Sequence, residues 1–247
     1  MARLRTTVDV IATVLVATAA GVLLWRTSET EHARGSEPRP QVERLDASGL
    51  YTDLVDAVTK GDPMATVVLI EYADFQCPFC KRFAKETFDR LDQRFVSTGL
   101  VQYAYRHYPL AKVHPVAMEA ARAAECAFRN GRFWEMREEL FANQDDMASL
   151  DWLELASRLG MDERRFEQCV SDDETQRSLD QQVAGAERLG VSSTPTFLIG
   201  ARGQDGMIHV LTRIRGAYPY EVFEGALEEV LASAKQAASS VSKRRHG

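Results

Sequence analysis

The chain has 247 residues, of which 45% are hydrophobic and 27% are charged, and its formal net charge at pH 7 is −6. This length allows a sizeable hydrophobic core without metals or dense disulfides, and the composition is that of an ordinary globular protein. The acidic balance excludes the basic face that nucleic-acid binding requires, and four cysteines are too few for a disulfide scaffold of this size.

The first segment is predicted to lie in a membrane. Residues 10–25 carry no charge, Arg3 and Arg5 precede them, and acidic residues follow. We expect a transmembrane signal-anchor, because such a helix nearly spans the hydrocarbon core and basic residues stay cytoplasmic. A cleaved signal peptide, with residues 17–19 as a cleavage site, and a buried globular helix are the alternatives. Both the anchor and the cleaved signal would export the remaining chain, either to the cell membrane or in secreted or periplasmic form.

The segment after the anchor leads into a predicted βαβ unit. Residues 26–41 are charged and offer almost nothing apolar to bury, which indicates a tether. We expect a short helix over residues 50–58 and a buried strand over the β-branched residues 66–72. Aromatic and leucine side chains at helical spacing predict a helix over residues 75–95, and residues 100–105 return to strand character. Such a unit implies a right-handed crossover to a parallel neighbour.

The middle of the chain changes to helical periodicity. Residues 111–190 are predicted to form several helices, and a capping-box pattern at residues 171–174 opens the last of them. Strands are expected over residues 196–199 and 208–214, and a closing helix over residues 221–235.

These elements predict seven segments. We expect a cytoplasmic N-terminus (1–9), an anchor (10–25), a flexible linker (26–48), the first part of an α/β domain (49–110), an inserted helical domain (111–190), the second part of the α/β domain (191–235) and a disordered basic tail (236–247).

The chemistry is expected at Cys77 and Cys80, a C-x-x-C pair placed after a buried strand and at the start of a helix. Unpaired N–H groups and the helix dipole favour a negative charge at this position, so the pKa of the first thiol should be low. The second cysteine, one turn later, can resolve a mixed disulfide. Pro78 suits the helix start because it has no N–H group to leave unpaired.

A C-x-x-C pair is also half of a zinc site. Structural zinc requires four ligands, and neither a second C-x-x-C nor a nearby histidine is present in the sequence. Copper delivery and a purely structural local disulfide are further alternatives to a redox centre. We predict a redox centre with no metal and no organic cofactor.

Four separated motifs, in the right order between residues 61 and 235, resemble those of DsbA-type proteins of the thioredoxin superfamily. They are residues 71–81 (EYADFQCPFCK), 106–110 (RHYPL), 123–136 with AAECA and GRFWEM, and 191–197 (VSSTPTF). The resemblance implies a thioredoxin-like α/β fold interrupted by a helical domain, and a thiol–disulfide oxidoreductase activity.

The resemblance also assigns roles to individual residues. Cys77 matches the exposed nucleophile and Cys80 the buried resolving cysteine. Thr194 and Pro195 match a cis-proline loop that offers backbone groups to an extended substrate. Glu71 matches a buried carboxylate that relays a proton to the resolving cysteine, although Asp74 could compete for this role and a solvated strand-end glutamate is the simpler interpretation.

The dipeptide between the cysteines departs from the best-known pattern of the family. Strong oxidases often carry a histidine there, whereas this chain has Pro78 and Phe79. Phe79 adds no charge beside the thiolate, so we expect a smaller decrease in the thiol pKa. Apolar surface around Phe79 should instead help to bind unfolded chains. His107 and His114 are expected to be structural rather than catalytic.

Cys126 and Cys169 lie in two predicted helices of the insert. As in some members of the family, they are expected to form a structural disulfide in an oxidising compartment. Two free buried thiols and a second redox pair are the alternatives.

The sequence therefore predicts an extracytoplasmic oxidase that introduces disulfides into exported, unfolded proteins through Cys77 and Cys80. The resemblance implies a quinone-linked membrane protein that reoxidises it. The alternatives are an isomerase or reductase kept reduced by a membrane donor, an enzyme with a narrow client such as a maturing cytochrome, and a non-catalytic metal-binding or partner-binding module.

Overall fold

The computed structural model describes residues 40–45 and 49–245. The predicted anchor at residues 10–25 and most of the predicted linker lie outside this part of the chain. Within the described residues, no helix combines the length and the apolar character needed to cross a bilayer.

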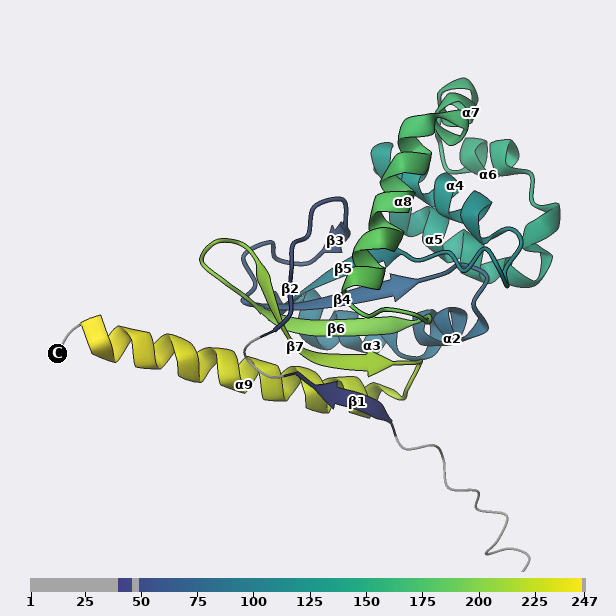
Figure 1. Ribbon diagram of the computed structural model, residues 1–247. Helices are drawn as coiled ribbons and strands as arrows, with labels where there is room; N and C mark the ends of the chain where they lie inside the picture. The colour runs from purple at the N-terminus through teal and green to yellow at the C-terminus, as the bar shows by residue number, and fades with distance from the viewer. Residues whose placement is uncertain (1–39, 46–48, 246–247) are drawn as a thin grey trace, which may run out of the picture. The chain divides into compact units, whose positions relative to one another are not determined.

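A mixed sheet of seven strands forms the centre of the described fold (Figure 1). In sheet order the strands are β1 (Gln41–Arg44), β7 (Ile208–Arg215), β6 (Thr196–Arg202), β4 (Val67–Ala73), β5 (Val101–His107) and β3 (Val58–Lys60), and β2 (Tyr51–Thr52) also pairs with β7. Only β4 and β5 run parallel among these pairs. Every residue of β4 is buried, Glu71 included, as its β-branched apolar character predicted. The expected α/β fold is confirmed.

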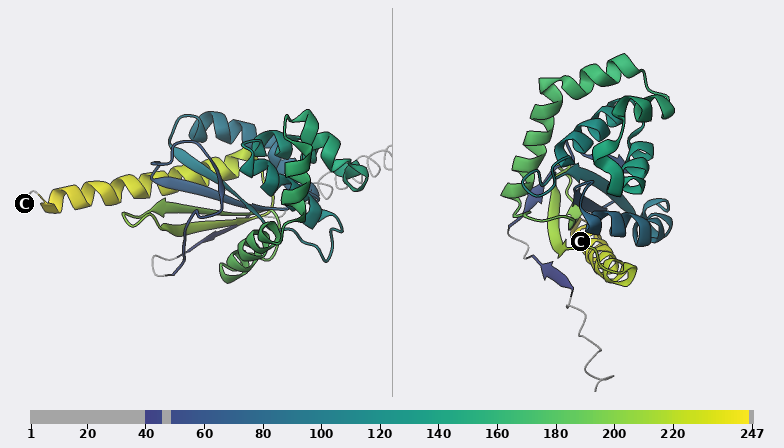
Figure 2. Two further views of the ribbon diagram at one scale, coloured as in Figure 1. Left: turned by 90° about the horizontal axis from the view of Figure 1, so that it is seen from above. Right: turned by 90° about the vertical axis from the view of Figure 1, so that its right-hand side faces the viewer.

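Helices cover both faces of the sheet. One face packs against α2 (Pro78–Glu86), α3 (Phe88–Leu91) and α9 (Tyr220–Arg245), with Phe83 in contact with Phe197 and Phe223. The other face packs against α8 (Asp173–Arg188). Figure 2 shows α8 and α9 on opposite sides of the sheet. The sheet is therefore shielded from solvent on both sides, which explains why alternating polar positions are absent from β4.

The helical insert lies between β5 and β6 in the sequence. It contains α4 (Ala117–Arg129), α5 (Phe133–Ala142), the 3₁₀-helical η2 (Gln144–Ser149), α6 (Trp152–Arg158), α7 (Glu163–Ser171) and α8. The carboxylates of Asp151, Asp162 and Asp172 accept backbone hydrogen bonds at the starts of α6, α7 and α8. The polar cap predicted near residues 171–174 therefore marks a real helix start, at Asp172.

Two segments expected to be helical or flexible are strands instead. The helix predicted for residues 50–58 is wrong, because β2 and β3 occupy this stretch and pair with β7 and β5. Tyr51 stacks on His209 with ring centroids 4.8 Å apart, so a long-range contact overrides the local preference. Residues 41–44, placed in the flexible linker, form β1 and pair with the edge strand β7.

Two helix boundaries also differ from expectation. The helix predicted over residues 75–95 is divided into α2, α3 and the π-helical η1 (Asp92–Val96). The break falls at Thr87, whose backbone angles (φ −120°, ψ −42°) lie outside the α-helical region and whose side chain donates a hydrogen bond to the Tyr218 carbonyl. The tail expected to be disordered is helical as far as Arg245.

Candidate redox site

The redox site begins where β4 ends. Cys77 lies in an extended conformation at the N-cap of α2, and Pro78 occupies the first turn. The Cys77 carbonyl accepts hydrogen bonds from the backbone N–H groups of Cys80 and Lys81, at 3.1 and 3.2 Å. No side chain caps this helix start, and backbone hydrogen bonds from Phe79 and Cys80 are among the causes that lower the pKa of the Cys77 thiol. The sequence thus places a thiol where a helix stabilises negative charge.

Both thiols are present in the free form, and they differ in environment. Cys77 is only 4% exposed, so the expectation of an exposed cysteine is wrong for this structure, and Cys80, as expected, is completely buried. A hydrogen bond from Cys80 is the main cause that lowers the pKa of Cys77 from 9.0 to about 6. Thr194 and the backbone at the start of α2 contribute to this decrease, and burial opposes it. Burial raises the pKa of Cys80 well above the usual range. This asymmetry gives one nucleophilic thiolate and one protonated resolving thiol.

A pH titration of the reduced protein should reveal this asymmetry. The ultraviolet absorbance of the thiolate is expected to rise with a midpoint near pH 6, the pKa that hydrogen bonding gives Cys77. Replacing Cys80 with alanine should move the midpoint upward, because it removes the largest cause of the decrease. The variant Cys77→Ser should lack the transition altogether. A midpoint near 9, the ordinary value for a thiol, would contradict the assignment.

The loop before β6 lies beside the nucleophile. The peptide bond between Thr194 and Pro195 is cis, as the resemblance implied. The Cys77 sulfur lies 3.3 Å from the Thr194 carbonyl oxygen. The Pro195 carbonyl accepts a hydrogen bond from the backbone N–H group of Gly216, which fixes this loop to the residue that follows β7. Phe79 is 51% exposed, and the Arg82 guanidinium lies 5.1 Å from its ring centroid. The structure therefore places an apolar side chain and a backbone loop at the thiol.

Glu71 lies inside the sheet, on β4, and is completely buried. The Tyr103 hydroxyl donates a hydrogen bond to its Oε2 atom, and the Arg137 guanidinium lies 3.8 Å from the same oxygen. Burial raises the pKa of Glu71 to about 7, although Arg137 and Tyr103 oppose the increase. The solvated strand-end interpretation is therefore wrong. A carboxyl group with this pKa is able to release and accept a proton at neutral pH.

Asp74 is fully engaged elsewhere. Its Oδ1 atom accepts a hydrogen bond from the Gln76 N–H group at 2.8 Å, and its Oδ2 atom accepts one from Leu110 at 2.7 Å. His114 Nδ1 lies 2.7 Å from the same Oδ2 atom. Asp74 thus ties the loop before Cys77 to the loop after β5, and both of its carboxylate oxygens are occupied.

Three residues of the site were missed at the sequence level. Arg137 and Tyr103 contact Glu71, and the Gln144 amide donates hydrogen bonds to the carbonyls of Phe75 and Cys77. Arg137 carried a usable signal, because it falls on the apolar face of α5, where an arginine indicates a buried counter-charge. No signal in the sequence identifies Tyr103 or Gln144, because both act on residues that are distant in the sequence.

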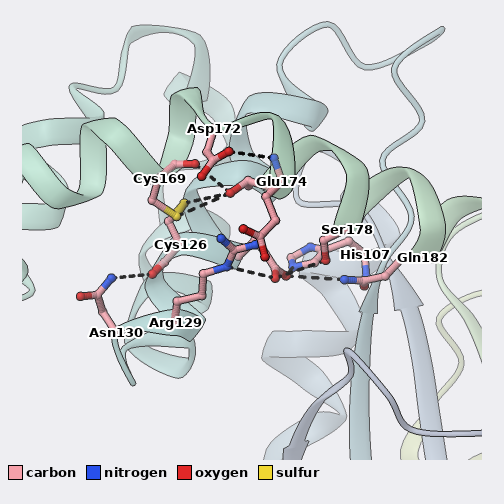
Figure 3. Close-up of polar contacts among 11 residues, drawn as sticks. His107, Cys126, Arg129, Asn130, Cys169, Asp172, Glu174, Ser178 and Gln182 are labelled. Atoms are coloured by element: carbon pink, nitrogen blue, oxygen red, sulfur yellow. Dashed lines mark hydrogen bonds and ion pairs between the residues drawn. A yellow bond between two sulfur atoms is a disulfide. The ribbon is translucent and has the colours of Figure 1, made fainter.

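The expected disulfide joins Cys126 of α4 to Cys169 of α7 with an S–S distance of 2.02 Å. Figure 3 shows it near a separate group of polar contacts that includes His107, Ser178 and Gln182. His107 is completely buried, and burial lowers its pKa to about 3, so its ring is neutral. No contact links His107 to either redox sulfur among the described residues. Within the same residues, no cluster of three or more metal-binding side chains is present.

Comparisons with known proteins agree with this geometry. The sequence model of the family described as "Thioredoxin" matches residues 53–210. Among solved structures, Pseudomonas aeruginosa DsbA2 is 26% identical, with a TM-score of 0.55 over 77% of this chain and 97% of that one. Oxidised BdbD from Bacillus subtilis is 18% identical, with a TM-score of 0.62 over 76% of this chain and 100% of that one. Alpha-DsbA1 from Wolbachia pipientis is 22% identical, with a TM-score of 0.62 over 74% of this chain and 94% of that one.

Curated relatives match over a shorter part of their own length. The protein named Na(+)/H(+) antiporter NhaA 3 from Salinispora tropica is 37% identical over 176 residues, which are 71% of this chain and 25% of the relative. NhaA 1 from Mycobacterium sp. (strain KMS) is 37% identical over 63% of this chain and 25% of its own length. The chain thus spans about a quarter of these relatives.

The fold and the buried cysteine pair define a thioredoxin-like protein with an inserted helical domain. The chain belongs to the thioredoxin family, and within it the described fold is of the DsbA type.

Proposed function

We propose that this protein is an extracytoplasmic thiol–disulfide oxidoreductase that introduces disulfides into exported polypeptides. The observation that carries the proposal is the asymmetry of the cysteine pair. Cys77, at the start of α2, has a pKa lowered to about 6, while Cys80 is buried with a raised pKa. A thiolate that is stable in the reduced enzyme is a good leaving group, so the corresponding disulfide is readily transferred to another protein.

The proposed reaction transfers two electrons from the substrate to the enzyme. A substrate thiolate attacks the Cys77 sulfur of the Cys77–Cys80 disulfide, and Cys80 leaves as a thiolate. Glu71 supplies the proton that this buried thiolate requires, since its pKa of about 7 leaves it partly protonated at neutral pH. A second substrate thiolate then attacks the substrate sulfur of the mixed disulfide. The products are an oxidised substrate and an enzyme with the Cys77 thiolate and the Cys80 thiol.

The surroundings of the thiol support an unfolded protein as substrate. Half-exposed Phe79 provides apolar contact, and Thr194 and Pro195 provide backbone groups beside Cys77. We propose that a quinone-linked membrane protein reoxidises the pair. The disulfide between Cys126 and Cys169 supports an oxidising compartment, because such bonds are rare in reducing ones. We further propose that residues 10–25 anchor the chain in the membrane.

The direction of electron flow is tested by two measurements. Alkylation trapping in intact cells should find Cys77 and Cys80 mainly oxidised. Equilibration with glutathione should give a reduction potential nearer to the roughly −120 mV of DsbA than to the roughly −270 mV of thioredoxin. A reduced pair in cells, together with a potential near that of thioredoxin, would identify a reductase or isomerase instead. Metal retained by the purified reduced protein would point to a thiol-based binding module.

A further inference from the structure

Arg137 is a buried cation supplied by the helical insert. Its side chain is 5% exposed, and its guanidinium carbon lies 4.7 to 6.0 Å from the centroids of four aromatic rings, those of Phe88, Phe141, Tyr105 and Trp134. These rings attract a cation through their negative faces. Burial of a charge is costly unless an opposite charge compensates it, so the position of Arg137 calls for an anionic partner.

Glu71 is that partner, and within the described part of the chain only one of its two carboxylate oxygens is in contact with neighbouring polar groups. The Arg137 Nη2 atom lies 3.8 Å from Glu71 Oε2, and the Tyr103 hydroxyl donates its hydrogen bond to the same oxygen. The other carboxylate oxygen, Oε1, is buried without a hydrogen-bond partner. Oε2 is therefore bound by the Tyr103 hydroxyl of β5 and attracted by the charge of Arg137, whose Nη2 atom makes no hydrogen bond among the described residues, while Oε1 remains available to exchange a proton.

We propose that Arg137 is a positioning residue whose charge attracts one oxygen of Glu71 and leaves the other ready to exchange a proton with the Cys80 sulfur. The inference rests on the proposed thiol–disulfide exchange and extends it, because it makes the helical insert part of the redox machinery. Proton transfer at Cys80 then depends on a residue far from the C-x-x-C motif in the sequence.

The groups facing Glu71 come from three neighbouring elements. α2 contributes the redox cysteines, β5 contributes Tyr103 and Tyr105, and α5 contributes Arg137. The Cys77 thiolate raises the pKa of Glu71, whereas Arg137 lowers it. Arg137 therefore keeps the carboxyl group able to ionise near neutral pH while a thiolate is present nearby. Without it, burial and the thiolate would keep Glu71 protonated. Glu71 could then no longer take up the proton of Cys80 in the reverse step, reoxidation of the pair, in which Cys80 attacks a mixed disulfide of Cys77.

The test follows the Glu71 carboxyl group itself by NMR in reduced protein with labelled glutamate. The signal is identified by its loss in the variant Glu71→Gln. In the variant Arg137→Met, which preserves bulk and removes charge, the midpoint of the Glu71 titration should move upward by about one pH unit or more. The variant Arg137→Lys retains the charge and should restore most of the original midpoint. If Arg137→Met does not fold, Arg137→Gln takes its place.

Arg158→Met is the matched control. Arg158 is another arginine of the insert, but it is 54% exposed and pairs with Glu139 at 3.3 Å. Its replacement should leave the Glu71 midpoint unchanged. An unchanged midpoint in Arg137→Met as well would overturn the inference, whichever way electrons flow through the cysteine pair.

The pH profile of Cys80 attack on a mixed disulfide is the second measurement. It should move upward in Arg137→Met by the same amount as the Glu71 midpoint, and Arg137→Met should add no further movement in the Glu71→Gln background. A Glu71 midpoint that moves while the exchange profile does not would show that Glu71 carries no proton for Cys80, and this too would overturn the inference. A reduction potential near that of thioredoxin, with both profiles moving, would leave the inference intact and refute only the proposed oxidase.

Discussion

Replacement of Cys77 by serine is expected to reduce disulfide exchange to the uncatalysed rate. Serine preserves the size of the side chain, but its hydroxyl group can form no disulfide with a substrate. In the variant Cys80→Ser, by contrast, the Cys77 thiolate can still attack a disulfide of an oxidised substrate and release one substrate thiolate. The mixed disulfide that forms has no resolving thiol to break it, so a covalent complex with the substrate should accumulate. Oxidative refolding of a reduced substrate protein measures the first effect, and non-reducing electrophoresis measures the second.

The control removes the other cysteine pair. The double variant Cys126→Ala/Cys169→Ala should retain exchange at temperatures where it is folded, because these sulfurs are bonded to each other in the insert. If Cys77→Ser retained exchange, or if the control lost it, Cys77 would not be the nucleophile.

Loss of the disulfide between Cys126 and Cys169 is expected to have the largest effect on stability. The bond closes a loop with a sequence separation of 43 residues. On the chain-entropy model, closing a loop of this size stabilises the folded state by roughly 4 kcal/mol. For a protein of this length, such a loss corresponds to a melting temperature lower by roughly 8–16 °C. Thermal unfolding of Cys126→Ala/Cys169→Ala measures the change.

The comparison is cleanest in a background that lacks the redox pair. In Cys77→Ser/Cys80→Ser, a strong reductant should lower the melting temperature as far as the two alanine substitutions do. In the protein that carries all four substitutions, the reductant should have no effect. Equal melting temperatures with and without the disulfide would show that the packing of α4 against α7 alone secures the insert.

The sequence predicted those parts of the fold that depend on local pattern. The apolar run that became β4 is buried on both faces, so its character did not depend on which strands flank it. The C-x-x-C motif predicted the start of a helix, and Cys77 is the N-cap residue of α2. The role of Pro195 came from the resemblance, since a cis bond at an ordinary X–Pro site is rare.

Features that depend on distant partners could not be predicted in this way. β1 has four residues, and it is a strand only because β7 offers a free edge. Residues 51 and 52 are extended for the same reason. At the site, Glu71 was identified, but its environment was not, because Tyr103 and Arg137 come from a strand and a helix that the fold alone brings together.

The central position of β4 has a consequence for how the chain folds. Its parallel neighbour β5 follows after one short crossover, but its antiparallel neighbour β6 begins only at residue 196, beyond the whole insert. At a synthesis rate of about 5–20 residues per second, the open edge of β4 waits on the order of ten seconds for its partner. During that time a strand that is apolar except for Glu71 exposes unpaired backbone groups, which favours association with other chains. A protein proposed to assist the folding of others would therefore itself require protection from aggregation while it is made.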